Sequence, residues 1–412
     1  MPWRGAIRTS DRMANSPTAA AQFRPPLTAL AVLLAGSPLM AMMFAALGPI
    51  LPLLAAQFGG ANGGAFAAQM IMTVPALGVI AGGLVAGIMV DRFGAKPVLL
   101  TGLVVFGLTG SSGLYLDSLP VLLVARMILG LAVAHVSTAI GVIVGSWFSG
   151  LSRARFLGFQ AGTAGVSALV FLLLSGVLAE RVGWRAPFGI YLLAFVVLVF
   201  AIVGLKGSQV PVRRHEAGGS VRDLFELWPV YLLALGLFAG YFMTSIQLSF
   251  LLAEDHIDSP IQRSLVIAGG VLAGGVMGAA YGPILARLGT RLMPCLVIGM
   301  LGAGLFIIGI SASVLVTAAG AVISGGGGGM IAPHIETLIL GRAPLDLRAR
   351  AISFMFTILY AADFLNPLIV TPLRLALGIH GAFVAIGAAL LIAALAAFGF
   401  TRTSIAASLD RH

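Results

Sequence analysis

The chain has 412 residues, of which 59% are hydrophobic and only 9% are charged, and its mean hydropathy is +1.06. Soluble domains carry about 25% charged residues, so this composition excludes a soluble domain and indicates a protein of the lipid bilayer. The 24 Lys and Arg against 14 Asp and Glu give a net charge of +10. In a membrane protein, the basic residues first indicate which side of the membrane each loop faces, so we expect no nucleic-acid partner.

The first 26 residues are polar and basic and lack the apolar core of a signal peptide, so we expect a disordered cytoplasmic segment there. Beyond them, apolar stretches recur, each near or above the roughly 20 residues that a helix needs to cross a bilayer. The pattern predicts an all-α membrane protein with twelve transmembrane helices. These are expected at residues 27–57, 66–90, 97–116, 119–147, 157–179, 186–205, 229–253, 264–285, 292–311, 314–340, 351–375 and 380–400.

A polar segment at residues 206–228 separates the first six predicted helices from the last six. Pro211, a Gly-Gly pair and several charged residues suit a solvated linker, with a short amphipathic helix near its end. We therefore predict a six-helix bundle at 27–205, a cytoplasmic linker at 206–228, a second bundle at 229–401 and a cytoplasmic tail at 402–412.

Basic residues set the expected orientation. The segments placed on one side of the membrane hold most of the Lys and Arg residues, including the chain start and the linker. The other side holds only Arg181, Arg185, Arg263 and Arg374. The positive-inside rule then places both termini in the cytoplasm, and we expect the cytoplasmic membrane of a bacterium.

The two halves also match each other at a constant offset of 195 residues. Gly94 falls on Gly289, Gly183 falls on Gly378, and Arg-Ala-Arg at 153–155 falls on the same triplet at 348–350. Glycine-rich apolar sequence matches itself easily, but a repeated basic triplet is improbable by chance in a chain with so few charges. The offset predicts duplicated six-helix halves, an architecture in which transporters alternate access to a central site.

A charged motif lies between the predicted helices 66–90 and 97–116. It reads Gly87-x-x-x-Asp91-Arg92-x-Gly94-x-Lys96, and an altered copy follows at 282–291. The motif resembles the signature loop of the major facilitator superfamily, and Arg126 followed by Gly130 is similar to that family's fourth-helix motif. The resemblance covers almost the whole chain after residue 26. It implies two pseudo-symmetric six-helix bundles and a secondary transporter that works by alternating access.

Two departures bear on the branch of the family. Ala95 stands at a basic position of the loop. The helix predicted at 157–179 contains Gly158, Gly162 and Gly165 but lacks the Gly-Pro pair typical of the drug-antiporter branch. The likeness to efflux members is therefore loose and leaves the direction of transport open.

The resemblance further implies a cytoplasmic gate formed by the loop. Asp91 would contact the other half near Arg348 and Arg350 when the cytoplasmic side is closed. The alternative is that Asp91 and Arg92 only cap helices and set topology. Ala286 replaces the aspartate in the second copy, so we expect only one such latch.

Asp363 is the candidate for proton coupling or for binding a cationic group. It lies about twelve residues into the helix predicted at 351–375, near the midplane, and Ala168 occupies the equivalent position of the first half. An ionisable group inside a span is costly and usually faces an internal cavity, where it can exchange a proton as water access alternates. The alternative is a permanent ion pair with a cation such as Arg126.

Four other ionisable residues within the spans are weaker candidates. Arg126 is the one cation inside a predicted helix and suits an anionic substrate, a coupling proton or a gating role. His135 and His334 lie in symmetry-related helices and titrate in a useful range, although an interhelical hydrogen bond is the commoner role. Glu336 lies near a helix end, where Arg342 is a possible partner.

Uncharged polar groups complete the set of candidates. Each is suited to lining a cavity or to an ordinary interhelical hydrogen bond. The cavity-lining candidates are Gln69, Tyr241, Gln247, Tyr360 and Asn366. A run from Gly325 to Gly329, followed by Pro333, allows either close packing or a hinge.

The sequence favours a secondary transporter over two other classes. It contains no nucleophile–base constellation, no histidine–carboxylate metal spacing and no phosphate loop, so we expect no enzyme, cofactor or metal. The third class is a non-transporting membrane sensor. Among transporters, the small number of polar groups in the spans favours proton-driven export of a small amphipathic compound or metabolite. Proton-coupled uptake of a small organic acid, using Arg126, is the alternative. We expect the protein to act as a monomer.

Overall fold

The computed structural model describes residues 26–205, 221–345 and 347–409, and within these ranges every regular element is helical. The predicted lead-in, most of the predicted linker and the last residues of the tail lie outside these ranges. The part of the linker that is described, Val221–Leu227, is the short helix η4, which confirms the helix expected near its end.

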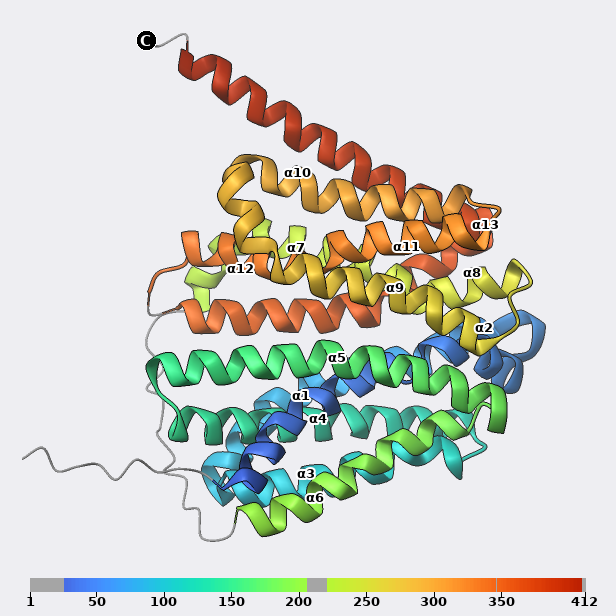
Figure 1. Ribbon diagram of the computed structural model, residues 1–412, viewed down its shortest axis with the longest axis vertical. Helices are drawn as coiled ribbons and strands as arrows, with labels where there is room; N and C mark the ends of the chain where they lie inside the picture. The colour runs from blue at the N-terminus through green and yellow to red at the C-terminus, as the bar shows by residue number, and fades with distance from the viewer. Residues whose placement is uncertain (1–25, 206–220, 346, 410–412) are drawn as a thin grey trace, which may run out of the picture.

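The helices follow each other in chain order along both halves. In the first half they are α1 (Leu27–Ala45), η1 (Gly48–Ile50), α2 (Leu51–Phe93), α3 (Ala95–Gly110), η2 (Ser111–Leu114), α4 (Leu119–Trp147), α5 (Gly150–Val182), η3 (Ala186–Leu192) and α6 (Leu193–Gly204). In the second half η4 is followed by α7 (Trp228–Phe242), the π-helix η5 (Met243–Gln247), α8 (Leu248–Glu254), α9 (Pro260–Ala279), α10 (Tyr281–Ile310), α11 (Val314–Gly329), α12 (Ile331–Arg342) and α13 (Arg348–Leu409). Figure 1 shows the two halves as neighbouring groups of helices, one blue to green and the other yellow to red.

Eleven stretches of the described chain are long and apolar enough to cross a membrane. The longest, Arg350–Gly399, breaks at Gly378, whose φ of 72° and ψ of 173° are not helical. It therefore supplies two crossings, so the described ranges contain the twelve crossings that were predicted. The range of α2 is unbroken, but the chain reverses direction within it. The close approach of Gly59 and Gly64 shows this reversal, since a Cβ at Gly59 would lie 2.3 Å from the Cα of Gly64.

Two of the glycines with positive φ recur at the predicted offset of 195 residues. Gly94 and Gly289 have φ of 87° and 71°, and Gly183 and Gly378 have φ of 108° and 72°. Each pair is separated by the same 195 residues that align the two halves in sequence. Positive φ is costly for residues with a side chain, so glycine marks the same two turns in each half.

Several helices extend beyond the apolar stretches that predicted them. The helix expected at 157–179 is α5, Gly150–Val182, and the one expected to end at 400 is α13, which continues to Leu409. The prediction at 119–147 coincides with α4. Hydropathy reports which residues enter the hydrocarbon, whereas a helix can continue through polar residues into water.

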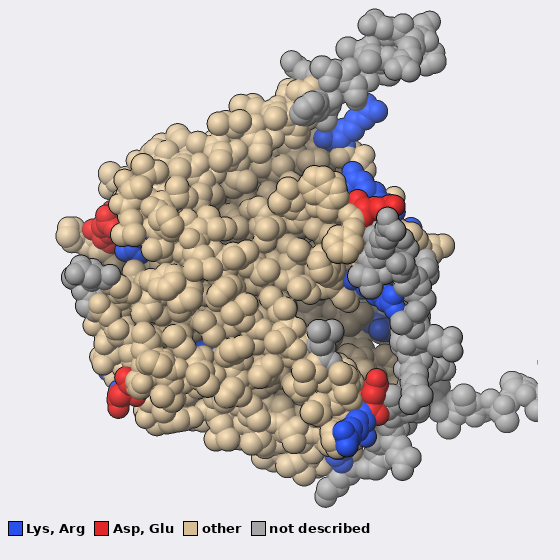
Figure 2. All heavy atoms as spheres, turned by 180° about the vertical axis from the view of Figure 1, so that it is seen from behind, with Lys and Arg blue, Asp and Glu red and all other residues tan. Residues whose placement is uncertain are grey.

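On the face shown in Figure 2, the exposed charged residues lie at the two ends of the bundle. Lys and Arg gather at one end, called here the basic end, and the surface between the ends is almost free of charge (Figure 2). The loop between α2 and α3, with Arg92 and Lys96, belongs to the basic end, and the end of α5 with Glu180 and the turn before α9 belong to the opposite end. This uncharged surface is the part suited to the hydrocarbon of a bilayer.

The halves touch at the opposite end and separate toward the basic end. A Cβ on Gly176 of α5 would lie 2.5 Å from the hydroxyl of Ser264 of α9, and the Ser249 hydroxyl donates a hydrogen bond of 2.6 Å to the carbonyl of Gly48. Farther along the same two helices, from Leu169 to Gly158 on α5, a cavity of about 650 Å³ lies between them. Between α5 and α9, the halves are therefore in contact at the opposite end and are separated by this cavity toward the basic end.

Candidate functional site

Asp363 is completely buried in α13, about midway between Arg350 and the corner at Gly378. Both of its carboxylate oxygens lack a hydrogen-bond partner. Tyr360 lies one helical turn before it and stacks on Phe44 of α1, with the ring centroids 6.1 Å apart. The carboxyl group is thus held between the two halves with no hydrogen bond to satisfy it, which is unusual for a buried polar group.

Arg126 is also fully buried, but its partners belong to the first half. Its Nε donates to the carbonyl of Ile71 at 2.9 Å, and its Nη2 donates to the Tyr191 hydroxyl at 3.3 Å. The guanidinium also lies over the Tyr191 ring, 5.2 Å from its centroid. The ion pair with Asp363 that was considered as an alternative is not formed here. One guanidinium nitrogen, Nη1, has no partner.

Three of the predicted cavity-lining side chains form a buried chain of amides, referred to below as the amide chain. Gln69 of α2 donates to the Oε1 of Gln247 at 3.1 Å. Gln247, at the end of the π-helix η5, donates to the Oδ1 of Asn366 at 3.1 Å, and Asn366 donates to the carbonyl of Ala239 at 3.0 Å. The amide chain therefore links the two halves at a position one helical turn from Asp363.

The wide turn of η5 is the local feature that brings Gln247 into this chain. A π-helix inserts one extra residue into an α-helix and often marks a functional site. Here it lies between α7 and α8, and Phe242 just before it stacks on Phe44 at 6.0 Å. The stacking of Phe44 on Phe242 and Tyr360 of the other half was not predicted, since an aromatic residue inside an apolar stretch has no distinguishing pattern.

Breaking the amide chain is expected to destabilise the protein. In the variant Gln247→Leu, the amide of Gln69 and the carbonyl of Asn366 remain buried without this partner, at a cost of about 1–3 kcal/mol for each unsatisfied group. Thermal unfolding in detergent should show a lower Tm for the single variant. The double variant Gln69→Leu with Gln247→Leu should lose less than the sum of the two single losses. Strictly additive losses would contradict the direct contact.

Within the described ranges, the hydrogen bonds of the two histidines do not reach the amide chain. His334 is buried in α12 with its Nδ1 at 3.2 Å from the Tyr281 hydroxyl, and His135 contacts the carbonyl of Leu131 in its own helix at 2.7 Å. Glu336 is half-buried. The contact of His334 is interhelical, which is the commoner role expected for such residues, whereas that of His135 lies within its own helix.

Tyr241 of α7 packs against the glycine run, Gly325 to Gly329, of α11. The ring of Tyr241 packs against Gly328, where a Cβ would be 2.2 Å from the ring. The neighbouring Gly325 and Gly329 face the backbone of α9, at Gly270 and Gly274. The run therefore allows close packing of α11 with several helices. The helix α11 ends at the last glycine of the run, and α12 begins two residues later, after Met330.

The signature loop lies exposed at the basic end. Gly94 makes the left-handed corner, and Lys96 donates to the carbonyl of Leu205 at 2.9 Å, which fastens the end of α6 to this loop. Asp91 is exposed and forms no ion pair with Arg348, whose Nε donates to the carbonyl of Ala343 at 3.3 Å. The latch with Arg348 is therefore not formed in this conformation, and it remains a prediction for the opposite one.

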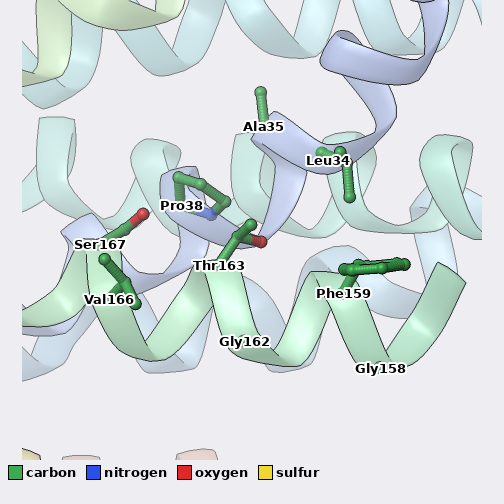
Figure 3. Close-up of a pocket in the computed structure, with 9 residues that line it drawn as sticks. All are labelled: Leu34, Ala35, Pro38, Gly158, Phe159, Gly162, Thr163, Val166 and Ser167. Atoms are coloured by element: carbon green, nitrogen blue, oxygen red, sulfur yellow. The ribbon is translucent and has the colours of Figure 1, made fainter. Parts of the chain in front are cut away.

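A second cavity, of about 490 Å³, lies between α1 and α5 (Figure 3). Figure 3 shows Pro38 of α1 facing Thr163 and Ser167 of α5 across it. Its walls are otherwise apolar, and Gly162 and Val166 line both this cavity and the one between α5 and α9. The glycines of α5 leave space beside the helix, but this hollow was not predicted from them. No cluster of three or more metal-ligating side chains occurs in the described ranges.

Comparison with known proteins gives the same fold and a family. The family model described as Major Facilitator Superfamily matches residues 33–362. Among curated proteins, the 3-(3-hydroxy-phenyl)propionate transporter of Escherichia coli (strain K12) is 25% identical over 349 residues, covering 80% of this chain and 83% of that protein. The Methylenomycin A resistance protein of Bacillus subtilis (strain 168) is 25% identical over 33% of this chain and 30% of that protein, and Organic anion transporter 3 of Sus scrofa is 30% identical over 21% and 16%. The match thus spans less than a third of these last two relatives.

Solved structures agree with the fold. A D-xylose–proton symporter matches with a TM-score of 0.73 and 15% identity over 90% of this chain and 97% of that chain. A bacterial homologue of the human lysosomal transporter Spinster, in an inward-facing and unoccupied conformation, matches with a TM-score of 0.74 and 15% identity over 90% and 96%.

Proposed function

Since the chain belongs to the major facilitator superfamily and is a multi-pass membrane transporter rather than an enzyme, we propose that it exports a small amphipathic compound in exchange for protons. The observation that carries the proton coupling is Asp363, buried between the halves with both carboxylate oxygens free of hydrogen bonds. A group in that setting is poorly stabilised as an anion and is suited to bind a proton in one conformation and release it in the other.

The lining supports an amphipathic solute. The amide chain offers few donors and acceptors, and these are mostly used by each other, whereas a sugar requires many. The cavities beside α5 are predominantly apolar. Two relatives named for antibiotic resistance and multidrug transport, both from Bacillus subtilis, support export.

Uptake of a small organic acid is the second candidate, and two observations favour it. The buried Nη1 of Arg126 has no partner, and a guanidinium nitrogen is suited to bind a carboxylate. The Escherichia coli relative, which is matched over 83% of its length, is named as a transporter of 3-(3-hydroxy-phenyl)propionate, a carboxylic acid.

Flux into proteoliposomes under opposite pH gradients separates the two candidates. An antiporter accumulates its substrate when the lumen is the more acidic side, because outward proton flow drives the substrate inward. A symporter accumulates it when the outside is more acidic. We expect accumulation with an acidic lumen for members of a panel of amphipathic toxic compounds, and none for aromatic carboxylic acids. Accumulation of an aromatic acid only with an acidic exterior would replace export by uptake.

A further inference from the structure

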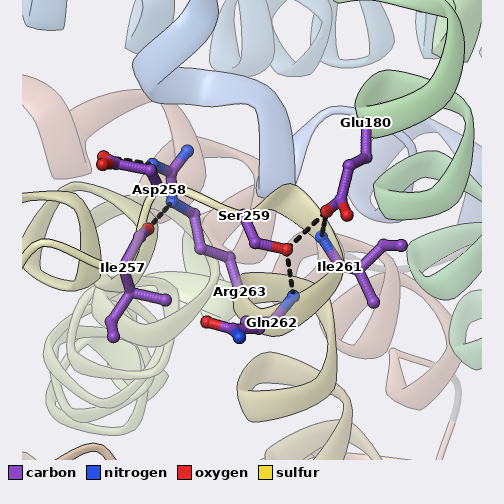
Figure 4. Close-up of polar contacts among 7 residues, drawn as sticks. All are labelled: Glu180, Ile257, Asp258, Ser259, Ile261, Gln262 and Arg263. Atoms are coloured by element: carbon purple, nitrogen blue, oxygen red, sulfur yellow. Dashed lines mark hydrogen bonds and ion pairs between the residues drawn. The ribbon is translucent and has the colours of Figure 1, made fainter.

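The halves are joined at the end opposite the basic end by a carboxylate that the sequence analysis did not single out. Glu180 lies near the end of α5 in the first half and reaches the start of α9 in the second half. Its Oε2 accepts a hydrogen bond from the hydroxyl of Ser259 and another, of 3.2 Å, from the backbone N–H of Ile261 (Figure 4). The first half therefore supplies an acceptor for the first turn of a helix that belongs to the other half.

The start of α9 is suited to hold such a carboxylate. Ser259 is the N-cap residue, and its hydroxyl oxygen accepts from the N–H of Gln262 at 3.3 Å. The first N–H groups of a helix have no partner within the helix, and its N-terminus carries a partial positive charge. Ser259 accepts from the N–H of Gln262, and Glu180 accepts from the N–H of Ile261, so both groups are satisfied only when the halves are together.

The neighbouring charges do not provide an alternative partner. Arg263, the buried cation of this region, donates to the carbonyl of Ile257 at 2.8 Å and lies 3.9 Å from Asp258 (Figure 4). Arg181 follows Glu180 on α5. Both hydrogen bonds of Glu180 go to the start of α9 and therefore cross between the halves.

The closest packing between α5 and α9 lies one turn inward from this contact. Gly176 faces Ser264, which is completely buried, with only 2.5 Å between the Ser264 hydroxyl and a Cβ built on Gly176. Any separation of the halves at this end must break the bonds of Glu180 and expose Ser264 to water.

We propose that Glu180 is the gating residue of this end, and that its carboxylate stabilises the closed arrangement by capping α9 across the two halves. Opening of this end then requires the release of Glu180 from Ser259 and Ile261. The proposal concerns the conformational equilibrium and needs neither proton coupling nor a particular substrate.

The experiment measures the exposure of position 264 in purified full-length protein in detergent. The native cysteine is removed as Cys295→Ala, Ser264→Cys is introduced, and the rate of reaction with a water-soluble maleimide is recorded. Adding Glu180→Gln should raise this rate about threefold to tenfold, because the neutral amide loses the charge interaction with the helix terminus. Ser259→Ala, which removes the hydroxyl that donates to Glu180, should also raise it.

Asp117→Asn is the matched control. Asp117 is an exposed acid at the same end, but it pairs with Arg185 of its own half, so its loss should leave the rate unchanged. All variants are compared after size-exclusion chromatography, and total reactivity is checked in denaturant. An unchanged rate in both Glu180→Gln and Ser259→Ala, or an equal rise in Asp117→Asn, would overturn the proposal. Because no substrate is used, that result would leave the proposed export reaction untouched.

Discussion

Asp363→Asn is expected to abolish accumulation of the substrate against its gradient while leaving the fold intact. One pH unit corresponds to about 1.36 kcal/mol per proton, which supports roughly a tenfold concentration ratio for one-to-one exchange. Asparagine has nearly the shape of aspartate but cannot bind and release a proton in this range. The variant should therefore bring the accumulation ratio from about ten down to about one in proteoliposomes with an acidic lumen.

The control for this prediction is Glu336→Gln. Glu336 is the other acid that lies inside a predicted span and clear of its ends, and it is only half-buried in α12. It should keep the gradient-driven accumulation of the parent protein. Counterflow without a pH gradient distinguishes a lost proton from a lost substrate site, since an uncoupled carrier still exchanges labelled for unlabelled compound. Full accumulation by Asp363→Asn would remove Asp363 from the coupling reaction.

The second large effect is expected at the glycine contact between α9 and α11. In Gly325→Ala the added Cβ would lie 2.2 Å from the carbonyl oxygen of Gly270, which is backbone and cannot move aside without separating the helices. Alanine is favoured over glycine in a helix interior by about 1 kcal/mol, but overpacking typically costs 1–3 kcal/mol and a backbone clash more. The variant should unfold several degrees below the parent in detergent.

Gly275→Ala is the matched control, because it makes the same chemical change in α9. A Cβ at Gly275 would meet nothing within 4 Å, so the gain in helix propensity is unopposed. Its Tm should equal or slightly exceed that of the parent. Equal Tm values for Gly325→Ala and Gly275→Ala would show that α9 and α11 are not in close contact in the protein.

Much of this architecture could be predicted from the sequence because the bilayer imposes a strict length and polarity on each span. The hydropathy pattern located every crossing, and the offset between the halves was visible in glycines and in a basic triplet. Asp363 was also recognisable, since a charged residue at mid-depth stands out in an apolar helix. These signals are local or periodic, and a single sequence retains them.

The pairing of side chains was not predictable in the same way. Arg126 contacts Tyr191, and Glu180 contacts Ser259, because of how distant helices are placed in space. Interhelical hydrogen bonds in a membrane need only one polar group on each helix, so many combinations are compatible with one sequence. The amide chain illustrates this, because Gln69 and Gln247 were recognised as candidates individually but not as partners.

The left-handed corners at Gly94 and Gly289 carry a record of the origin of the protein. If the two halves descend from one duplicated ancestor, a turn shared by both copies was already present in that ancestor. Asp91 has no counterpart at Ala286, so the difference in charge arose after the duplication, on a corner that did not change. Under that descent, the backbone bend is older than the difference in charge that now distinguishes the two halves.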